Sequence, residues 1–436
     1  MPTYHIWTLG CQMNQADSLK LAAGLDRIGY VEANDEHSAD LVVINTCSVR
    51  QHAEDRAYSR LGRLAKRRAG GASFSLAVMG CMVGPKTGEL ERRFPVVDVW
   101  ARPQQFDPIL ELAAPPRDVS LGELGASVAW DETFGTPQGP TAFVPVVHGC
   151  DKFCTYCIVP LRRGREMSRP VADVLAEIRH LAERGVREVT LLGQTVEAYG
   201  HDLEGEPDLA TLFAGIEEID GIARTRFLTS YPKDMTDRII DAVADLPKVC
   251  EHFNIPVQSG SDAMLARMRR GYTVAEYEER VARIRSRMPD VALSTDVIVG
   301  CPGESDAEFG ETVALLERTG FDVIHVAAYS PRPGTYAYRN SPDDVAHEVK
   351  QERLQVIERL HAASSERINR TLLDRTVEVL VEREKEGRST GRTRGGRLVH
   401  FPGTGRTGEL VDVTIERATA WSLQGHAPGS IPLEAV

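Results

Sequence analysis

The sequence predicts an α/β protein of three parts: an N-terminal parallel-sheet α/β domain, a central partial barrel of strand–helix units, and a small all-β barrel at the C-terminus. Three observations support this prediction. The chain has 436 residues, more than the ~250–300 at which one hydrophobic core usually divides. Short apolar strands alternate with amphipathic helical stretches over most of its length. After Arg370 the pattern changes to a strict alternation of apolar and polar residues.

Residues 1–118 form the predicted N-terminal domain. Strands are expected at Tyr4–Leu9, Asp40–Thr46 and Ser75–Met79, with amphipathic helices between them. This alternation is typical of a parallel sheet covered by helices. A connection rich in Pro and Gly follows, and we expect residues 119–135 to be a linker.

Residues 136–367 form the predicted central domain. Six apolar runs are each followed by a helical stretch, which favours a partial (β/α)6 barrel that the charged helix from Asp343 to about Arg370 closes. The six expected strands are Phe143–His148, Glu188–Gly193, Thr225–Ser230, Phe253–Val257, Leu293–Gly300 and Val323–Tyr329. Residues 370–433 alternate with period two between Gly-rich turns, which predicts a small all-β barrel.

Composition narrows the class of protein. With 51 basic and 63 acidic residues the net charge is −12, so any nucleic acid must bind local basic patches. The sequence has no apolar run long enough for a membrane-spanning helix, and its first residues lack the pattern of a signal peptide. We therefore expect a soluble, cytoplasmic protein without a membrane partner. In such a protein, clustered cysteines are typical of metal or redox sites.

Three of the eight cysteines, Cys150, Cys154 and Cys157, form a C-x3-C-x2-C motif directly after a predicted strand. Three thiolates in one short loop can bind three irons of a 4Fe-4S cluster and leave the fourth iron without a protein ligand. That iron can chelate S-adenosylmethionine, which one electron then cleaves to a radical. The alternatives are a zinc site, which would need a fourth ligand, and a redox pair of Cys154 and Cys157, which leaves Cys150 unexplained.

A second set of cysteines is dispersed. Cys11, Cys47 and Cys81 each follow the end of a predicted strand. The carboxyl ends of parallel strands share one edge of the sheet, so these thiols could converge on a second cluster. The alternative is three separate buried thiols. For Cys250 and Cys301 we expect packing in the core.

At this point the sequence resembles a known family. Successive blocks of the chain are similar to those of the methylthiotransferases, and the likeness covers nearly the whole chain. Gln12-Met13-Asn14 and Gln258-Ser259-Gly260-Ser261 favour the branch that makes 2-methylthio-N6-isopentenyladenosine in transfer RNA. The blocks include GCQMNQADS, NTCSVR, GCDKFCTYCIVP, LLGQTVEAYG, TSYPKDM, PVQSGSDAMLARMRRGYT, STDVIVGCPGE and YSPRPGT. Where the family usually reads GQN-x-N, this chain has Gln194-Thr195-Val196-Glu197.

The resemblance implies a radical SAM barrel in the centre and a TRAM barrel, an RNA-binding module, at the C-terminus. It implies two 4Fe-4S clusters, one on Cys150, Cys154 and Cys157 and an auxiliary one on Cys11, Cys47 and Cys81. S-adenosylmethionine would serve as methyl donor and as radical source. The implied partners are the tRNA anticodon stem-loop, a reducing electron donor and a sulfur donor, and we expect a monomer. Beyond the cluster ligands the sequence predicts no catalytic residue.

Four polar residues at predicted strand ends should face the same mouth of the barrel as the radical cluster. Gln194, Ser230, Gln258 and Asp296 are our candidates for contacts with the cofactor or the base, and turn or barrel-layer packing is the alternative.

Two groups of arginines could contact RNA phosphates. One lies at helical spacing after Cys47, where an exposed helix face is the alternative, and the other lies in the Gly-rich C-terminal part. These are Arg56, Arg60, Arg63 and Arg67, and then Arg388, Arg392, Arg394, Arg397 and Arg406.

Two rival functions stay open at the level of the sequence. The chain could be a methylthiotransferase of the branch that acts on threonylcarbamoyl-adenosine or on a ribosomal-protein aspartate. It could instead be an RNA-binding module whose cysteines hold structural zinc.

Overall fold

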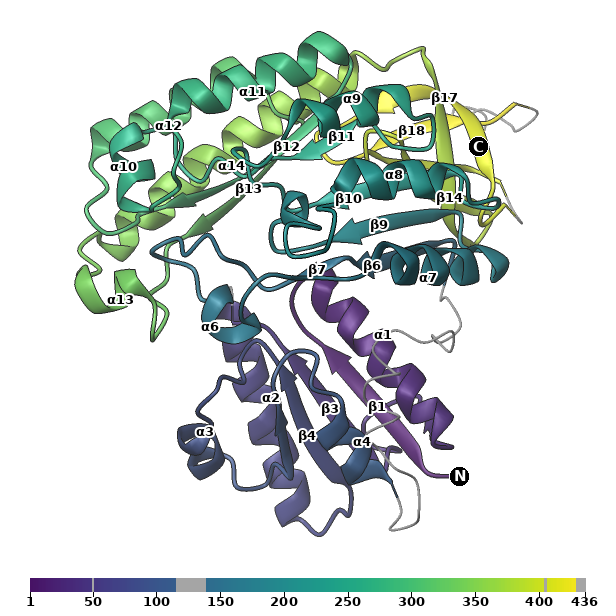
Figure 1. The fold of residues 1–436 in the computed structure, drawn as a ribbon, viewed down its shortest axis with the longest axis vertical. Helices are drawn as coiled ribbons and strands as arrows, with labels where there is room; N and C mark the ends of the chain where they lie inside the picture. Colours follow the sequence, from purple (N-terminus) through teal and green to yellow (C-terminus); the bar gives the residue numbers. More distant parts are fainter. Residues whose placement is uncertain (49–50, 115–138, 404–405, 429–436) are drawn as a thin grey trace. The chain divides into compact units, whose positions relative to one another are not determined.

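The structure, a computed structural model, describes residues 1–48, 51–114, 139–403 and 406–428 (Figure 1). The chain divides into two compact units. The first comprises residues 1–136, 148–153 and 157–167, and the second comprises residues 137–147, 154–156 and 168–436. The predicted linker at 119–135 lies outside the described residues. No helix in the described ranges has the length and apolar character required to cross a membrane.

The first unit is built on a parallel sheet, as the sequence predicts, but the sheet has five strands where the sequence indicated three. The order is β2-β1-β3-β4-β5, and every pairing is parallel. The sequence missed β2 and β5 because two and three residues are too few to show a period. The strands are β1 (Thr3–Thr8), β2 (Val31–Glu32), β3 (Leu41–Thr46), β4 (Ser75–Gly80) and β5 (Val99–Ala101).

Helices cover both faces of this sheet. Leu61 and Leu64 of α2 (Gln51–Ala69) pack against apolar residues of β3 and β4 on one face. The opposite face is covered by α1 (Gln12–Arg27) and α4 (Asp107–Ala113), whose side chains share a core with Val43 and Met79. Two short helices complete the unit, α3 (Gly88–Arg93) and α6 (Val159–Arg163).

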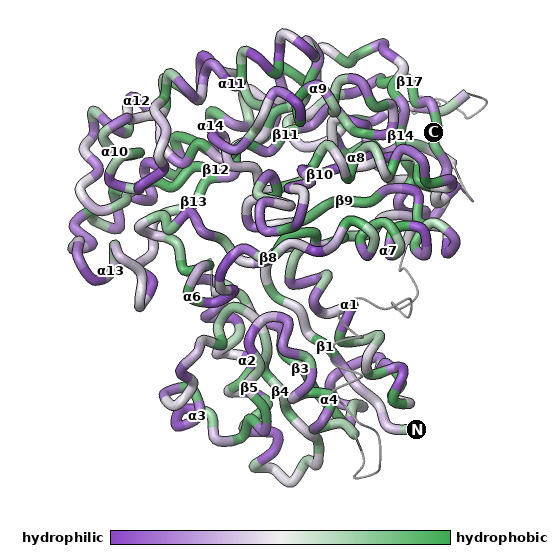
Figure 2. Tube along the Cα trace, viewed as in Figure 1, coloured by the Kyte–Doolittle hydropathy of each residue, from purple (hydrophilic) through white to green (hydrophobic). Residues whose placement is uncertain are grey.

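The second unit contains the six predicted strand–helix repeats. Its strands form two parallel sheets, ordered β10-β9-β6 and β11-β12-β13. The Thr225 amide of β10 donates to Lys248 O, and the Cys250 amide donates to Thr225 O, so that these backbone bonds join the two sheets just before β11 begins. The strands are β6 (Thr141–Pro145), β9 (Glu188–Leu192), β10 (Arg224–Leu228), β11 (His252–Asn254), β12 (Ala292–Val299) and β13 (Val323–Ala328). All five residues of β9 are buried, and its trace is among the apolar segments in Figure 2.

Helices α7 to α14 and two short strands complete the strand–helix part of the chain. Capping boxes start α11 and α12, where Thr273 pairs with Glu276 and Ser305 with Glu308. The helices are α7 (Val171–Glu183), α8 (Leu209–Glu217), α9 (Asp237–Asp245), α10 (Asp262–Arg267), α11 (Val274–Arg287), α12 (Asp306–Thr319), α13 (Tyr336–Asn340) and α14 (His347–Arg370). The short strands are β7 (Val147–His148) and β8 (Met167–Ser168).

The C-terminal strands close into the predicted small barrel, in the order β14-β15-β16-β18-β17. Alternate residues such as Val379, Val381 and Val413 fill its interior, which is the physical basis of the period-two pattern. The barrel belongs to the same compact unit as the strand–helix repeats. Its strands are β14 (Thr376–Lys385), β15 (Arg388–Thr393), β16 (Leu398–Pro402), β17 (Leu410–Ala418) and β18 (Leu423–His426).

Arginines of β10 attach the small barrel to the rest of its unit. The Arg224 side chain is fully buried and donates to Arg392 O at 2.7 Å, to Glu378 O at 3.1 Å and to the Glu378 carboxylate at 2.7 Å. Arg226 donates to the backbone carbonyls of Thr393 and Arg394. These bonds supply donors to backbone carbonyl groups that are shielded from water and would otherwise have no hydrogen-bond partner.

We predict that Arg224→Met lowers the free energy of unfolding by about 3 kcal/mol, because it leaves buried carbonyls and a carboxylate without their donor. Urea unfolding followed by circular dichroism measures this change. The control is Lys385→Met on β14, whose side chain is 71% exposed and should alter stability little. Equal effects of the two substitutions would contradict the prediction.

Candidate metal and cofactor sites

Three cysteines of the first unit lie at the carboxyl edge of its sheet. Cys11 caps the N-terminus of α1 just after β1, and Cys47 and Cys81 directly follow β3 and β4. Since β1, β3 and β4 are adjacent and parallel, the three residues share one edge. A Cβ atom on Gly10 would lie 3.1 Å from the Cys47 sulfur, and Cys11 acts electrostatically on Cys81. The structure thus brings the three thiols together; their role as ligands stays a prediction.

Polar side chains that the sequence did not indicate hold this edge in place. Asn14 Nδ2 donates to Leu9 O at 2.6 Å and to Thr46 O at 2.8 Å, which ties the exits of β1 and β3. Arg163 Nη2 donates to Asn14 Oδ1 and Asp17 Oδ2, both at 2.9 Å. The ion pair is almost fully buried, with 2% and 1% of the two side chains exposed.

The charge of Arg163 also acts on a thiol. Burial raises the pKa of Cys81, and the neighbouring Arg163 guanidinium opposes that rise. A thiolate must form before iron can bind. The arginine therefore favours the charged form that a cluster requires.

The C-x3-C-x2-C motif lies in the loop between β7 and α6. The Cys150 amide donates to Gly164 O at 3.1 Å, and in the second unit Arg270 Nη1 donates to Cys154 Sγ at 3.4 Å. Gly149 has φ +76°, and a Cβ there would lie 2.0 Å from Arg165 O, so only glycine fits at the start of this loop.

The available donor set fits iron–sulfur clusters. All eight cysteines are thiols, and six of them form the two trios. Among the described residues, the structure assembles no group of three or more His, Cys, Asp or Glu side chains that could hold a metal ion. Each cysteine of a 4Fe-4S cluster binds a different iron, so its ligands do not converge on one point. The other two cysteines, Cys250 and Cys301, are 0% and 3% exposed.

Of the four polar candidates of the barrel, three follow strands of the second unit and one lies inside a strand. Gln194 follows β9, Ser230 follows β10, Gln258 follows β11, and Asp296 lies within β12. The Gln194 Oε1 atom is buried without a hydrogen-bond partner, so it is available to a bound group. The backbone N–H of Gln258 donates to the backbone carbonyl oxygen of Asp296 at 2.8 Å. Whether these side chains contact the cofactor stays a prediction.

Asn254, which the sequence did not single out, connects three of these strand ends. Its Oδ1 accepts from the Thr229 amide at 3.2 Å, and its Nδ2 donates to Asp296 Oδ2 at 3.0 Å. Thr229 and Gln258 have φ of +72° and +71°, a conformation that is strained for residues other than glycine. Strain of this kind concentrates at functional sites, where surrounding contacts maintain it.

Glu197 is a buried carboxyl group at the same end of the barrel. It lies in the 3-10 helix Val196–Ala198 and is 1% exposed, and its Oε2 accepts from the Tyr231 amide at 3.0 Å. Burial raises its pKa to about 7, although the hydrogen bond from the Tyr231 amide acts in the opposite direction. A neutral carboxylic acid combines an O–H donor with an acceptor oxygen, and the amide of asparagine likewise combines donor and acceptor groups. Glu197 occupies the position at which the methylthiotransferases, the family that the sequence resembles, usually have asparagine.

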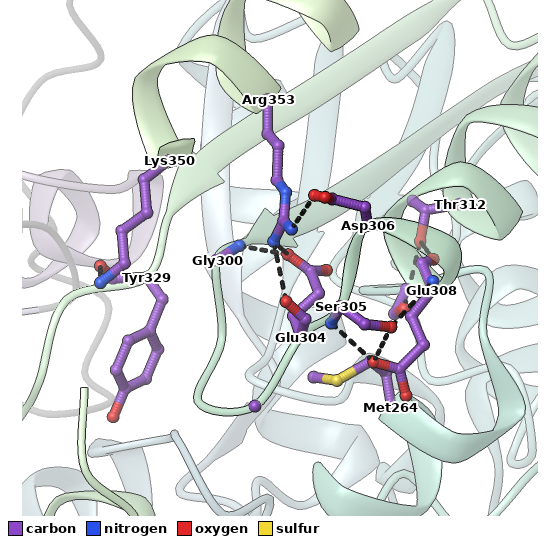
Figure 3. A network of polar contacts seen from close by, with 12 residues as sticks. Met264, Gly300, Glu304, Ser305, Asp306, Glu308, Thr312, Tyr329, Lys350 and Arg353 are labelled. Carbon is purple, nitrogen blue, oxygen red and sulfur yellow. Dashed lines mark hydrogen bonds and ion pairs between the residues drawn. The ribbon is translucent and has the colours of Figure 1, made fainter. Parts of the chain in front are cut away.

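The loop after β12 is fixed by a polar network (Figure 3). Glu304 accepts from the Gly300 amide at 2.5 Å and from Arg353 Nη1 at 2.7 Å. The other amino group of Arg353 donates to Asp306 Oδ1 at 2.8 Å. Helix α14 therefore holds this loop at the end of its strand.

Several arginines predicted to contact RNA are instead engaged within the chain. Arg60 pairs with Glu36 and lies over the Trp7 ring, and Arg67 donates to the carbonyls of Glu36 and His37. Arg394 pairs with Glu251 through two bonds, and Arg397 pairs with Asp322. These contacts give the four guanidinium groups internal structural roles.

A basic surface remains on the small barrel. Arg388 begins β15 and is exposed, as is Arg383 of β14. Both act on His400 of β16, whose pKa is lowered by burial and by these two positive charges. Arg383 was not among the predicted contacts because it lies in a regular strand and not in the Gly-rich stretch.

Comparison with known proteins places these sites in a family. Residues 144–316 match the radical SAM superfamily, residues 3–102 match the uncharacterized protein family UPF0004, and residues 370–427 match the TRAM domain. The tRNA-2-methylthio-N(6)-dimethylallyladenosine synthase of Chloroflexus aurantiacus is 44% identical over 97% of this chain and 91% of the relative. The synthase of Dehalococcoides mccartyi is 43% identical over 97% and 98%.

A solved structure shows the same fold. The radical S-adenosylmethionine methyltransferase TsrM from Kitasatospora setae, with cobalamin and a 4Fe-4S cluster bound, superposes with a TM-score of 0.58. It is 15% identical and covers 78% of this chain and 74% of its own. At this identity the likeness extends to the fold alone.

We predict that Glu197→Gln changes how stability depends on pH. The folded state keeps the Glu197 proton between pH 4.5 and about 7, whereas the unfolded state loses it near 4.5. The free energy of unfolding should therefore fall by about 3 kcal/mol as pH rises through this window, and the substitution should remove this fall. Thermal unfolding at pH 5 and pH 8 measures the difference.

The exposed Glu204→Gln in the same segment should leave the pH dependence unchanged. Parallel pH profiles for Glu197→Gln and the unmodified protein would show that Glu197 titrates as an ordinary carboxylate.

Proposed function

This chain belongs to the family of tRNA-2-methylthio-N(6)-dimethylallyladenosine synthases, and from that premise we propose that it transfers a methylthio group to carbon 2 of N6-isopentenyladenosine beside the tRNA anticodon. One observation carries the proposal. Six of the eight cysteines occur as two trios, one in a single loop and one at the shared edge of β1, β3 and β4. The proposed reaction needs one cluster for radical formation and one for sulfur transfer, each with an iron that has no protein ligand.

The residues of the chain would bind and orient the reactants. Cys150, Cys154 and Cys157 would hold the radical cluster, and Cys11, Cys47 and Cys81 the auxiliary cluster that handles sulfur. One molecule of S-adenosylmethionine would supply the methyl group, and a second molecule, cleaved by one electron, would supply the radical that activates the C2–H bond. Gln194 would accept a hydrogen bond at the barrel mouth through its Oε1 atom. Asn254 and the network around Glu304 would keep the strand ends in fixed positions.

The small barrel would contribute to binding the RNA. The matched TRAM domain covers residues 370–427, and Arg383, Arg388 and His400 share one surface within it. Positive side chains bind phosphates with little sequence preference. The target adenosine lies in a loop, where displacing a base from its stack costs less than in a duplex.

We predict that the two cysteine trios have separable functions. Cys154→Ala should abolish cleavage of S-adenosylmethionine, because the radical cluster loses a ligand. Cys47→Ala should retain cleavage but lose methylthio transfer. The iron content of each variant after anaerobic reconstitution should be about four per chain, compared with about eight for the unmodified protein. Iron and sulfide analysis, with mass spectrometry of tRNA nucleosides, measures these outcomes.

Cys250→Ala is the matched control, because Cys250 is a fully buried thiol outside both trios. It should keep about eight irons and full transfer. Cleavage retained in Cys154→Ala would overturn the assignment of the radical cluster. A methylthio product on a protein, and none on tRNA, would place the chain in a different branch of the methylthiotransferases.

We predict that the double variant Arg383→Ala and Arg388→Ala weakens tRNA binding. The slope of log affinity against log salt should decrease by about 1.5, because two phosphate contacts are lost. Fluorescence anisotropy with a labelled anticodon stem-loop measures the slope. Arg318→Ala, which removes an arginine of α12 paired with Glu278, should leave the slope unchanged. An unchanged slope in the double variant would exclude this surface.

A further inference from the structure

Buried arginines in the second unit are paired with carboxylates. Arg169 pairs with Glu177, Arg226 with Glu188 and Arg353 with Glu304, and in each pair both side chains are at most 8% exposed. Arg224 pairs with Glu378. The pairing follows from electrostatics, because a charge removed from water requires an opposite charge close by.

Arg270 is as deeply buried but differs in its partners. It is 6% exposed, and among the described residues no carboxylate forms an ion pair with it. Its Nη2 donates to Pro256 O at 3.0 Å and its Nε to the Tyr272 hydroxyl at 2.9 Å. The guanidinium carbon lies 4.7 Å from the ring centroid of Tyr231 and 5.3 Å from that of Tyr272.

The remaining amino group of Arg270 faces the cysteine loop. Nη1 donates to Cys154 Sγ at 3.4 Å and to the Tyr156 hydroxyl at 3.5 Å. Neither Tyr231 nor Tyr272 serves as the counterion, because burial raises the pKa values of both and keeps their hydroxyls neutral. Of the groups that Arg270 contacts, the Cys154 sulfur is the one that becomes an anion when it binds iron.

We propose that Arg270 is a positioning residue of the radical cluster: it supplies the countercharge and a hydrogen bond to the Cys154 thiolate and thereby raises the reduction potential of that cluster. The inference rests on the proposed function, which assigns Cys154 as a ligand. Hydrogen bonds to the ligand sulfurs and nearby positive charge stabilise the reduced, more negative cluster. An easier reduction favours the one-electron step on which radical formation depends.

The buried arginine that contacts the auxiliary trio has a carboxylate partner, unlike Arg270. Arg163 lies beside Cys81 but is neutralised by Asp17, whose Oδ2 is 2.9 Å away. The two trios therefore differ in whether the buried arginine beside them is paired with a carboxylate. Substitution of Arg270 should thus affect the radical cluster and leave the auxiliary cluster unchanged.

The test isolates the radical cluster in full-length protein in which Cys11, Cys47 and Cys81 are all alanine. In this background Arg270→Met, Arg270→Gln and Arg270→Lys are compared by redox titration followed with electron paramagnetic resonance. At a fixed potential Arg270→Met should lower the ratio of reduced to oxidised cluster about tenfold, which corresponds to about 59 mV for one electron. Arg270→Gln should lower it similarly, and Arg270→Lys should lie closer to the unsubstituted background.

The matched control is Arg353→Met, since Arg353 is 5% exposed but paired with Glu304. It should lower thermal stability without moving the potential. If Arg270→Met fails to bind iron, Arg270→Gln and Arg270→Lys decide the question, because they differ in charge. Equal potentials in the neutral variant, the charged variant and the background would overturn the proposal.

Failure of the proposed function would give a different result. A background protein without about four irons per chain would show that the C-x3-C-x2-C trio does not hold a cluster. If substitution of Arg270 shifts the reduction potential but the unmodified protein gives no methylthio product on tRNA, the role of Arg270 is supported and the tRNA substrate is rejected.

Discussion

The common direction of the parallel strands is the constraint on which both candidate sites depend. In the first unit β1, β3 and β4 run side by side, so the residues that follow them meet at one edge although Cys11 and Cys81 are far apart in sequence. In the second unit the same rule collects Gln194, Ser230 and Gln258 after the ends of their strands. Strand polarity gathers these side chains, and local hydrogen bonds through Asn14 and Asn254 then fix where they lie.

Buried charge is the second determinant of the architecture. A protein of net charge −12 contains many arginines whose guanidinium groups are buried and serve as internal connectors. Arg224 and Arg394 join the small barrel to the strand–helix repeats, and Arg353 joins α14 to the loop after β12. A buried guanidinium requires a partner. Each such contact therefore also restricts how the elements of the chain can pack against one another.

The sequence predicted the three-part fold and the position of the cysteines after strand ends. Both follow from apolar periodicity, which is a local signal that short stretches of sequence contain. It missed β2 and β5, which are too short to show a period. It also missed Asn14, Glu197 and Arg270, because their significance comes from partners that are distant in sequence. For the same reason it could not separate arginines that bind within the chain, such as Arg394, from those that stay exposed, such as Arg388.

The shortness of β2 and β5 affects how the protein behaves before it receives its clusters. These are the two outer strands of the first sheet, with two and three residues. An outer strand offers unpaired amide and carbonyl groups to other chains, and a short one offers few of them. A newly made chain whose thiols have not yet bound iron therefore presents little template for sheet-to-sheet aggregation.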